Sequence, residues 1–213
     1  MTRFARCGVL CVLVSAPIAA LASISGAMLP ALPNPTAAPA QQAETRLVIG
    51  EAERDLTGDG RPEALRVVGV GPSIDNLAVT FTIASDGRTI YRYDLWPMTR
   101  AVGFDGRRQL LSVEQHRARL EEFGPWFLGA EKFERPDEFV ANLRKQAPAR
   151  AAEIPEVIER DRAPSDLVPG DVIWREIRTA PVTIFTFSPG GDALVAIGWN
   201  ARAGRFYRLL DCC

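Results

Sequence analysis

Apolar and polar residues alternate strictly in residues 76–84 (NLAVTFTIA), where every second side chain from Leu77 to Ile83 is apolar. This period of two is typical of a strand with one buried face. Further strands are predicted at residues 47–51, 63–70 and 89–96. The Asp-Gly pair within residues 85–88 predicts a hairpin turn before the last of these strands. The first half of the folded region is therefore predicted to be a β-meander.

The centre of the chain changes to a helical pattern. Ser112 and Gln115 have the spacing of a capping box at the start of a helix. Helices are predicted at residues 109–122, 137–146 and 149–160, and Gly124-Pro125 is predicted to interrupt the first. Residues 161–171 are polar and contain proline, which is typical of a loop.

Strands are predicted again near the C-terminus, at residues 172–178, 182–187, 193–199 and 205–210. An order of strands, then helices, then strands predicts an α+β fold. We expect one mainly antiparallel sheet, built from the N- and C-terminal strands, with the central helical segment packed on one face.

The N-terminus has the pattern of a secretory signal peptide. Arg3 and Arg6 precede an apolar run over residues 7–22, which ends in Ala-Leu-Ala. The run is shorter than the roughly 20 apolar residues of a membrane span and contains Pro17. Cleavage after residue 22 is therefore favoured over a retained membrane tether, which is the alternative, and residues 38–40 are a weaker second cleavage site. The expected location is the periplasm or the exterior, with no membrane span after cleavage.

Residues 23–45 are rich in Pro and Ala and predict a disordered linker, which leaves residues 46–213 as a single α+β domain. The charge is balanced, with 25 basic and 26 acidic residues, and shows no basic patch suited to nucleic acid. After cleavage, Cys212 and Cys213 are the remaining cysteines. In an oxidising compartment they predict an intermolecular disulfide, a strained vicinal ring or a modification, and hence allow a disulfide-linked dimer.

The segment DLTGDGRPE, residues 55–63, is the strongest candidate for a site. Oxygen-bearing residues stand at alternate positions, Asp55, Thr57, Asp59 and Glu63, and Arg61 can offer its backbone carbonyl. Ca²⁺ takes roughly six to eight oxygens and tolerates irregular geometry, so this spacing is suited to a calcium loop. The same residue types also form ordinary turns without a metal, and that alternative stays open.

Followed by a Val-rich strand, this segment resembles the calcium loop of FG-GAP and VCBS-type repeats. The resemblance implies that Asp55, Asp59 and Glu63 are carboxylate ligands, with Thr57 and the Arg61 carbonyl completing a structural Ca²⁺ site. It covers only this loop and the strand after it. Thr57 and Glu63 depart from the residues that the family favours, and the tandem blades of a propeller do not follow from it.

A catalytic constellation is not apparent in the sequence. His116 is the single histidine and is predicted on a solvated helix face, and a Gly-x-Ser-x-Gly elbow is absent. Trp96, Trp126, Trp174 and Trp199 could stack on sugars but more often belong to a core or its rim. We expect an exported, non-enzymatic binding domain with a protein or glycan partner; the alternative is a cell-envelope hydrolase or hydrolase inhibitor acting on glycan or peptide.

Overall fold

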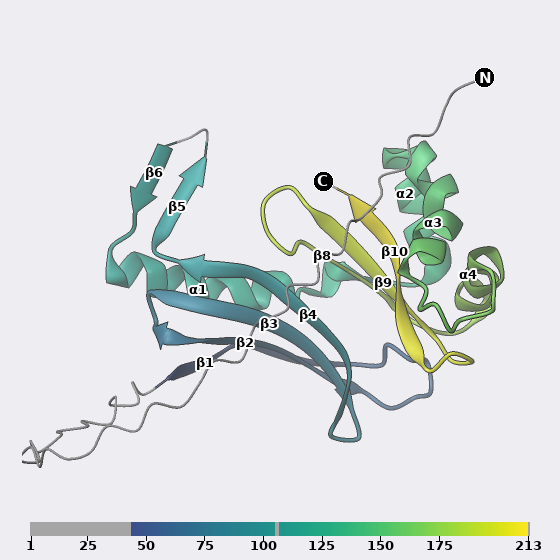
Figure 1. The fold of residues 1–213 in the computed structure, drawn as a ribbon, viewed down its shortest axis with the longest axis horizontal. Helices are drawn as coiled ribbons and strands as arrows, with labels where there is room; N and C mark the ends of the chain where they lie inside the picture. The colour runs from purple at the N-terminus through teal and green to yellow at the C-terminus, as the bar shows by residue number, and fades with distance from the viewer. Residues whose placement is uncertain (1–43, 105–106, 213) are drawn as a thin grey trace, which may run out of the picture. The chain divides into compact units, whose positions relative to one another are not determined.

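The computed structural model describes residues 44–104 and 107–212 and confirms the α+β class. The N-terminal meander forms a four-stranded antiparallel sheet in the order β1-β2-β3-β4 (Figure 1). Its strands are β1 (Thr45–Arg54), β2 (Glu63–Ser73), β3 (Asn76–Ser85) and β4 (Arg88–Thr99). A two-stranded hairpin follows, formed by β5 (Ala101–Phe104) and β6 (Arg107–Leu110).

The second half of the chain contains the helices and another sheet. The helices are α1 (Val113–Phe127), a 3₁₀ turn η1 (Ala130–Lys132), α2 (Pro136–Gln146), α3 (Pro148–Asp161) and α4 (Gly170–Thr179). The sheet has the order β10-β9-β8-β7, with β7 (Phe133–Glu134), β8 (Ile184–Phe187), β9 (Leu194–Asn200) and β10 (Arg205–Cys212). The prediction of one sheet joining both ends was therefore wrong, because N- and C-terminal strands pair only among their own neighbours.

An aromatic cluster joins the two four-stranded sheets. The ring of Phe81 on β3 lies 5.3 Å from that of Phe127 on α1 and 5.2 Å from that of Phe185 on β8. Phe187 completes the cluster, and all four rings are buried. Because α1 supplies Leu120 and Phe127 to this core, the helix packs on the meander sheet.

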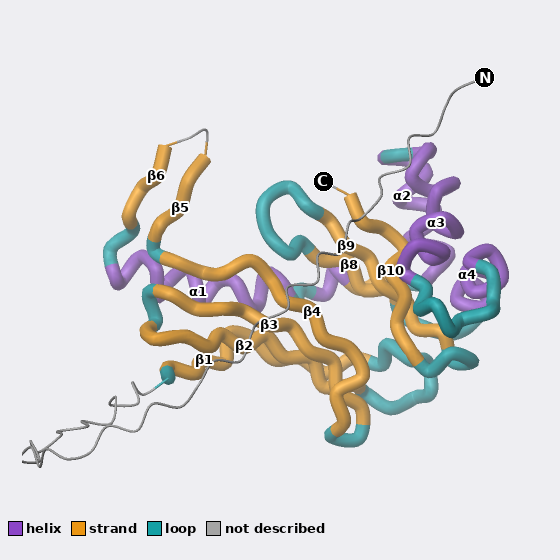
Figure 2. The backbone as a smooth tube through the Cα atoms, viewed as in Figure 1, coloured by secondary structure: helices purple, strands orange, loops and turns teal. Residues whose placement is uncertain are grey.

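Helices α2, α3 and α4 cover the other sheet instead, so the helices do not share one face (Figure 2). Ile154 and Ile158 of α3 and Ile173 and Ile177 of α4 pack with Tyr207 of β10. The strand predicted at residues 172–178 is thus wrong. The spacing of Ile173 and Ile177 is that of one helix face, but so short a segment is also compatible with a strand. The helix is formed because these two residues pack against β10.

Helix α1 differs from prediction in three ways. It begins at Val113 and not at residue 109, because residues 109 and 110 pair within the β5–β6 hairpin. It continues through Pro125 to Phe127, where the Leu128 N–H donates to the Gly124 carbonyl at 3.0 Å and Phe127 is held in the core. His116 is fully buried instead of solvated, and its Nε2 lies 2.9 Å from the Ile74 carbonyl in the β2–β3 turn. The predicted capping box between Ser112 and Gln115 is present at the start of the helix.

None of the helices in residues 44–104 and 107–212 is long and apolar enough to cross a membrane. The predicted leader and most of the linker lie outside the described residues, as does Cys213.

Candidate functional site

The acidic loop, residues 55–63, connects β1 to β2 and is held by its own carboxylates. Asp55 accepts hydrogen bonds from the Gly58 N–H at 2.7 Å and from the Gly60 N–H at 3.0 Å. Asp59 accepts from the Arg61 N–H at 2.8 Å, on the exposed side of the loop. Such side-chain-to-backbone bonds fix a tight turn without any ligand.

Glu63 is the buried acceptor of this loop. Its side chain is fully buried, and Oε2 accepts from the Leu56 N–H at 2.7 Å and from the Thr57 N–H at 3.3 Å. Oε1 accepts from the Thr57 hydroxyl at 3.0 Å. Three hydrogen-bond donors therefore compensate the cost of burying this carboxylate. In return, the carboxylate gives the Leu56 and Thr57 N–H groups the acceptor that a neighbouring strand would otherwise supply.

The acidic loop also contacts the segment that leads into β8. The Thr183 hydroxyl donates to the Asp55 carbonyl at 2.9 Å, and the Thr183 N–H donates to the Leu56 carbonyl at 3.2 Å. Gly58 has φ +75°, and a Cβ there would lie 2.7 Å from the Pro181 carbonyl oxygen. The loop therefore connects the two four-stranded sheets.

The carboxylates among the five predicted ligands accept hydrogen bonds within the loop and are not gathered as a metal site. Asp55 and Glu63 each use both carboxylate oxygens on N–H or O–H donors, and Glu63 lies beneath the loop. Across the described part of the chain, no three Asp, Glu, His or Cys side chains are grouped as a metal site requires. As arranged, the donor set does not fit Ca²⁺, which needs several oxygens at about 2.3–2.6 Å. Calcium binding thus remains a prediction from the sequence alone, which the arrangement of the loop does not support.

We expect the thermal unfolding midpoint to be the same in EDTA and in millimolar Ca²⁺, because the loop carboxylates already have partners. Differential scanning calorimetry of the chain and of an Asp59→Ala variant measures this. A calcium-dependent rise that Asp59→Ala abolishes would establish an ion site at the loop, since an ion bound only by the folded state stabilises it.

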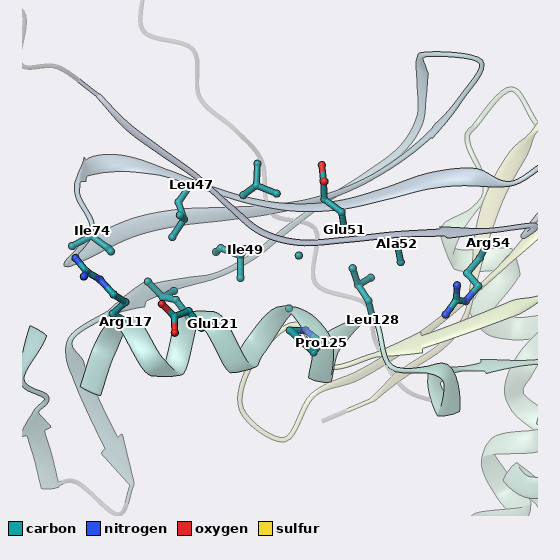
Figure 3. A pocket seen from close by; sticks show the side chains of 14 residues that line it. Leu47, Ile49, Glu51, Ala52, Arg54, Ile74, Arg117, Glu121, Pro125 and Leu128 are labelled. Atoms are coloured by element: carbon teal, nitrogen blue, oxygen red, sulfur yellow. The ribbon is translucent and has the colours of Figure 1, made fainter. Parts of the chain in front are cut away.

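A groove of about 840 Å³ lies between β1 and α1, and we call it the β1/α1 groove. β1 is an edge strand, since it pairs with β2 alone among the described strands. The apolar part of the lining comes from Leu47, Ile49, Leu120 and Leu128. Figure 3 shows Leu47 and Ile49 pointing from the strand toward the helix.

The polar part of the groove carries both signs of charge. Arg117 and Glu121 stand one turn apart on α1, and Arg54 comes from β1. The Glu51 side chain of the same strand points away from the helix (Figure 3). Glu51 pairs with Arg66 of β2 at 2.9 Å, on the exposed face of the sheet. An apolar centre with a polar, charged rim is the general layout of protein interfaces.

Two glycines hold the helix against the strand at the middle of the groove. A Cβ on Gly124 would lie 2.1 Å from the Ile49 carbonyl oxygen, and one on Gly50 would lie 2.7 Å from the Gly124 Cα. The backbones of β1 and α1 are therefore in direct contact, and this contact fixes the width of the groove.

A second hollow of about 600 Å³ lies beside Trp96 at the end of β4. The indole is 62% exposed and covers Gly190, where a Cβ would lie 2.5 Å from the indole Cγ. Trp126 is also exposed, whereas Trp174 and Trp199 pack partly buried against the core. The expectation of core or rim positions therefore holds for two of the four tryptophans.

No motif in the sequence indicates the β1/α1 groove. The one sequence signal for it is the meander pattern, in which the first strand lies at a sheet edge. Comparisons with protein-family models, with curated proteins and with solved structures found no match for this chain.

Proposed function

We propose that this chain is an exported, non-enzymatic interaction domain that binds an extended polypeptide strand in the β1/α1 groove. The observation that carries the proposal is the combination of an edge strand, an adjacent helix and an apolar lining in one groove of about 840 Å³. An added strand would pair its backbone with β1 and place alternate side chains against Leu47, Ile49 and Leu128.

The acidic loop has a structural part in this proposal. It fixes the end of β1 through Glu63 and joins it to the β8 sheet through Thr183. A rigid edge strand loses less entropy when a partner strand is added, which favours binding. The loop thereby supports the groove without contacting the bound strand.

The experiment is a selection of random 12-residue peptides displayed on phage against the immobilised chain without residues 1–22. We expect enriched peptides to lose at least about tenfold in affinity for a Glu121→Trp variant, whose indole fills the groove. The matched control is Glu122→Trp, which is also exposed on α1 but does not line the groove. Methylation of alternate peptide N–H groups should also abolish binding, because strand pairing needs those donors.

Peptides that bind both tryptophan variants equally would contradict the groove as the binding site. A failure to enrich any peptide would contradict strand addition. Mass spectrometry of the recovered peptides separates binding from the hydrolase alternative, because an interaction domain returns them intact.

Export is tested by secretion of the full chain from a bacterial host. We expect Edman sequencing of the periplasmic product to begin at residue 23, because a short apolar run that ends in Ala-Leu-Ala is suited to signal peptidase. A product that retains Met1 in the membrane fraction would instead support a tethered protein.

A further inference from the structure

We propose that the strand bound in the β1/α1 groove is β1 of a second copy of this chain, paired antiparallel across a two-fold axis between Ile49 and Gly50. The inference rests on the proposed function and names its partner. It would join two four-stranded sheets into one sheet that continues through both copies.

The observation behind it is a bulge in β1. Val48 pairs with Val68 and Gly50 with Val67, so Ile49 is an extra residue in the strand. After the bulge, the side chains that point to a given face of the sheet stand one position later than a regular strand would place them. As a result, the exposed face carries Arg46, Val48, Glu51 and Glu53, whereas Leu47, Ile49 and Ala52 are partly or fully buried.

The bulge restricts self-pairing to one register over the whole strand. Residues opposite each other in a ladder must lie on the same face of the sheet. A two-fold axis between Ile49 and Gly50 places the two bulges opposite each other. On both sides of the axis, exposed residues of one strand then lie opposite exposed residues of the other, and inward residues opposite inward ones. A shift by one residue sets exposed residues against inward ones along the strand. A shift by two does so at the bulge, where Val48 would face Ile49 or Gly50 would face Glu51.

This register is also complementary in charge. It places Arg46 opposite Glu53 of the second copy, and the two-fold axis repeats that pair. Both side chains are exposed, and neither takes part in an ion pair within residues 44–104 and 107–212. On the groove side, the register sets Leu47 against Ala52, so an apolar contact faces the helix.

The same charges disfavour other strands. Charged residues and bulges on an edge strand usually prevent indiscriminate pairing. The bulge and the charges of β1 allow pairing only with a strand that has a bulge at the same place. That strand must also carry an acidic residue opposite Arg46 and a basic residue opposite Glu53. A second copy of β1 meets both conditions.

The test is sedimentation equilibrium of the chain without residues 1–22, which contains the whole compact unit Gln41–Cys213. Reductant is present throughout, so that Cys212 and Cys213 cannot form a disulfide dimer. We expect Arg46→Glu and Glu53→Arg each to weaken dimerisation by about tenfold, because each change creates two like-charged pairs. The double variant R46E/E53R should return to within about threefold of the unmodified chain.

Arg88→Glu is the matched control, since it makes the same charge change at an exposed position of β4, away from β1. It should leave the dimer unchanged. Circular dichroism of every variant confirms folding, so a loss of dimer cannot be mistaken for unfolding.

A chain that stays monomeric at millimolar concentration would overturn the inference, as would a dimer that is insensitive to both single reversals. Selected peptides that still bind the groove of such a monomer would leave the proposed function in place. If peptides and the second copy both fail to bind, the proposed function fails as well.

Discussion

Replacement of Glu63 by alanine is expected to lower the free energy of unfolding by about 3–5 kcal/mol. The change removes a fully buried carboxylate that accepts from the Leu56 N–H, the Thr57 N–H and the Thr57 hydroxyl. The Leu56 N–H would remain buried without an acceptor, and a cavity would form beneath the loop. Urea denaturation followed by circular dichroism measures the loss.

Two further variants in the same loop give reference values for this loss of stability. Asp59→Ala removes a carboxylate that serves only the exposed Arg61 N–H, so its loss should stay below about 1 kcal/mol. Glu63→Gln keeps the shape and one good acceptor, and we expect an intermediate loss. If Glu63→Ala proved as mild as Asp59→Ala, the Glu63 carboxylate would not be the buried acceptor that holds the loop.

Replacement of Gly124 by alanine is expected to destabilise the fold by about 1–3 kcal/mol, against the usual preference of helices. In an ordinary helix interior the change would stabilise by up to about 1 kcal/mol, because glycine is a poor helix former. Here the new Cβ would lie 2.1 Å from the Ile49 carbonyl oxygen and 2.8 Å from the Gly50 Cα. Both neighbours are backbone atoms of β1, so the helix must move away from the strand.

The sign of the change in unfolding free energy therefore distinguishes the helix preference for alanine from the steric contact with β1. Glu122→Ala, at an exposed position on the same helix, should alter stability by less than about 0.5 kcal/mol. A Gly124→Ala variant that is more stable than the unmodified chain would show that α1 is not in contact with β1. The same denaturation experiment reports both variants.

Local periodicity predicted much of the fold. The alternation in residues 76–84 lies within β3, and the Ser112–Gln115 capping box is formed at the start of α1. Both are local features, since their determinants lie within a few residues of each other. Residues 172–178 show the limit, because a short segment with apolar residues at Ile173, Trp174 and Ile177 is compatible with a strand or a helix until its packing partner is known.

The site was harder to predict because long-range contacts define it. Oxygen spacing correctly marked residues 55–63 as a tight loop, but the hydrogen bond from Thr183 to Asp55 joins residues that are 128 positions apart. That contact helps to place the loop against the second sheet, where Glu63 is buried. The β1/α1 groove likewise depends on the approach of Gly124 to Gly50, which no local pattern indicates.

Amide hydrogen exchange tests directly whether β1 receives an added strand. Exchange is compared for the chain alone at low concentration and for the chain saturated with a selected peptide or with itself. We predict slower exchange at Thr45–Arg54 and along the side of α1 that lines the groove, because an added strand protects the outward N–H groups of an edge. Protection confined to the hollow beside Trp96, with β1 unchanged, would contradict strand addition at β1.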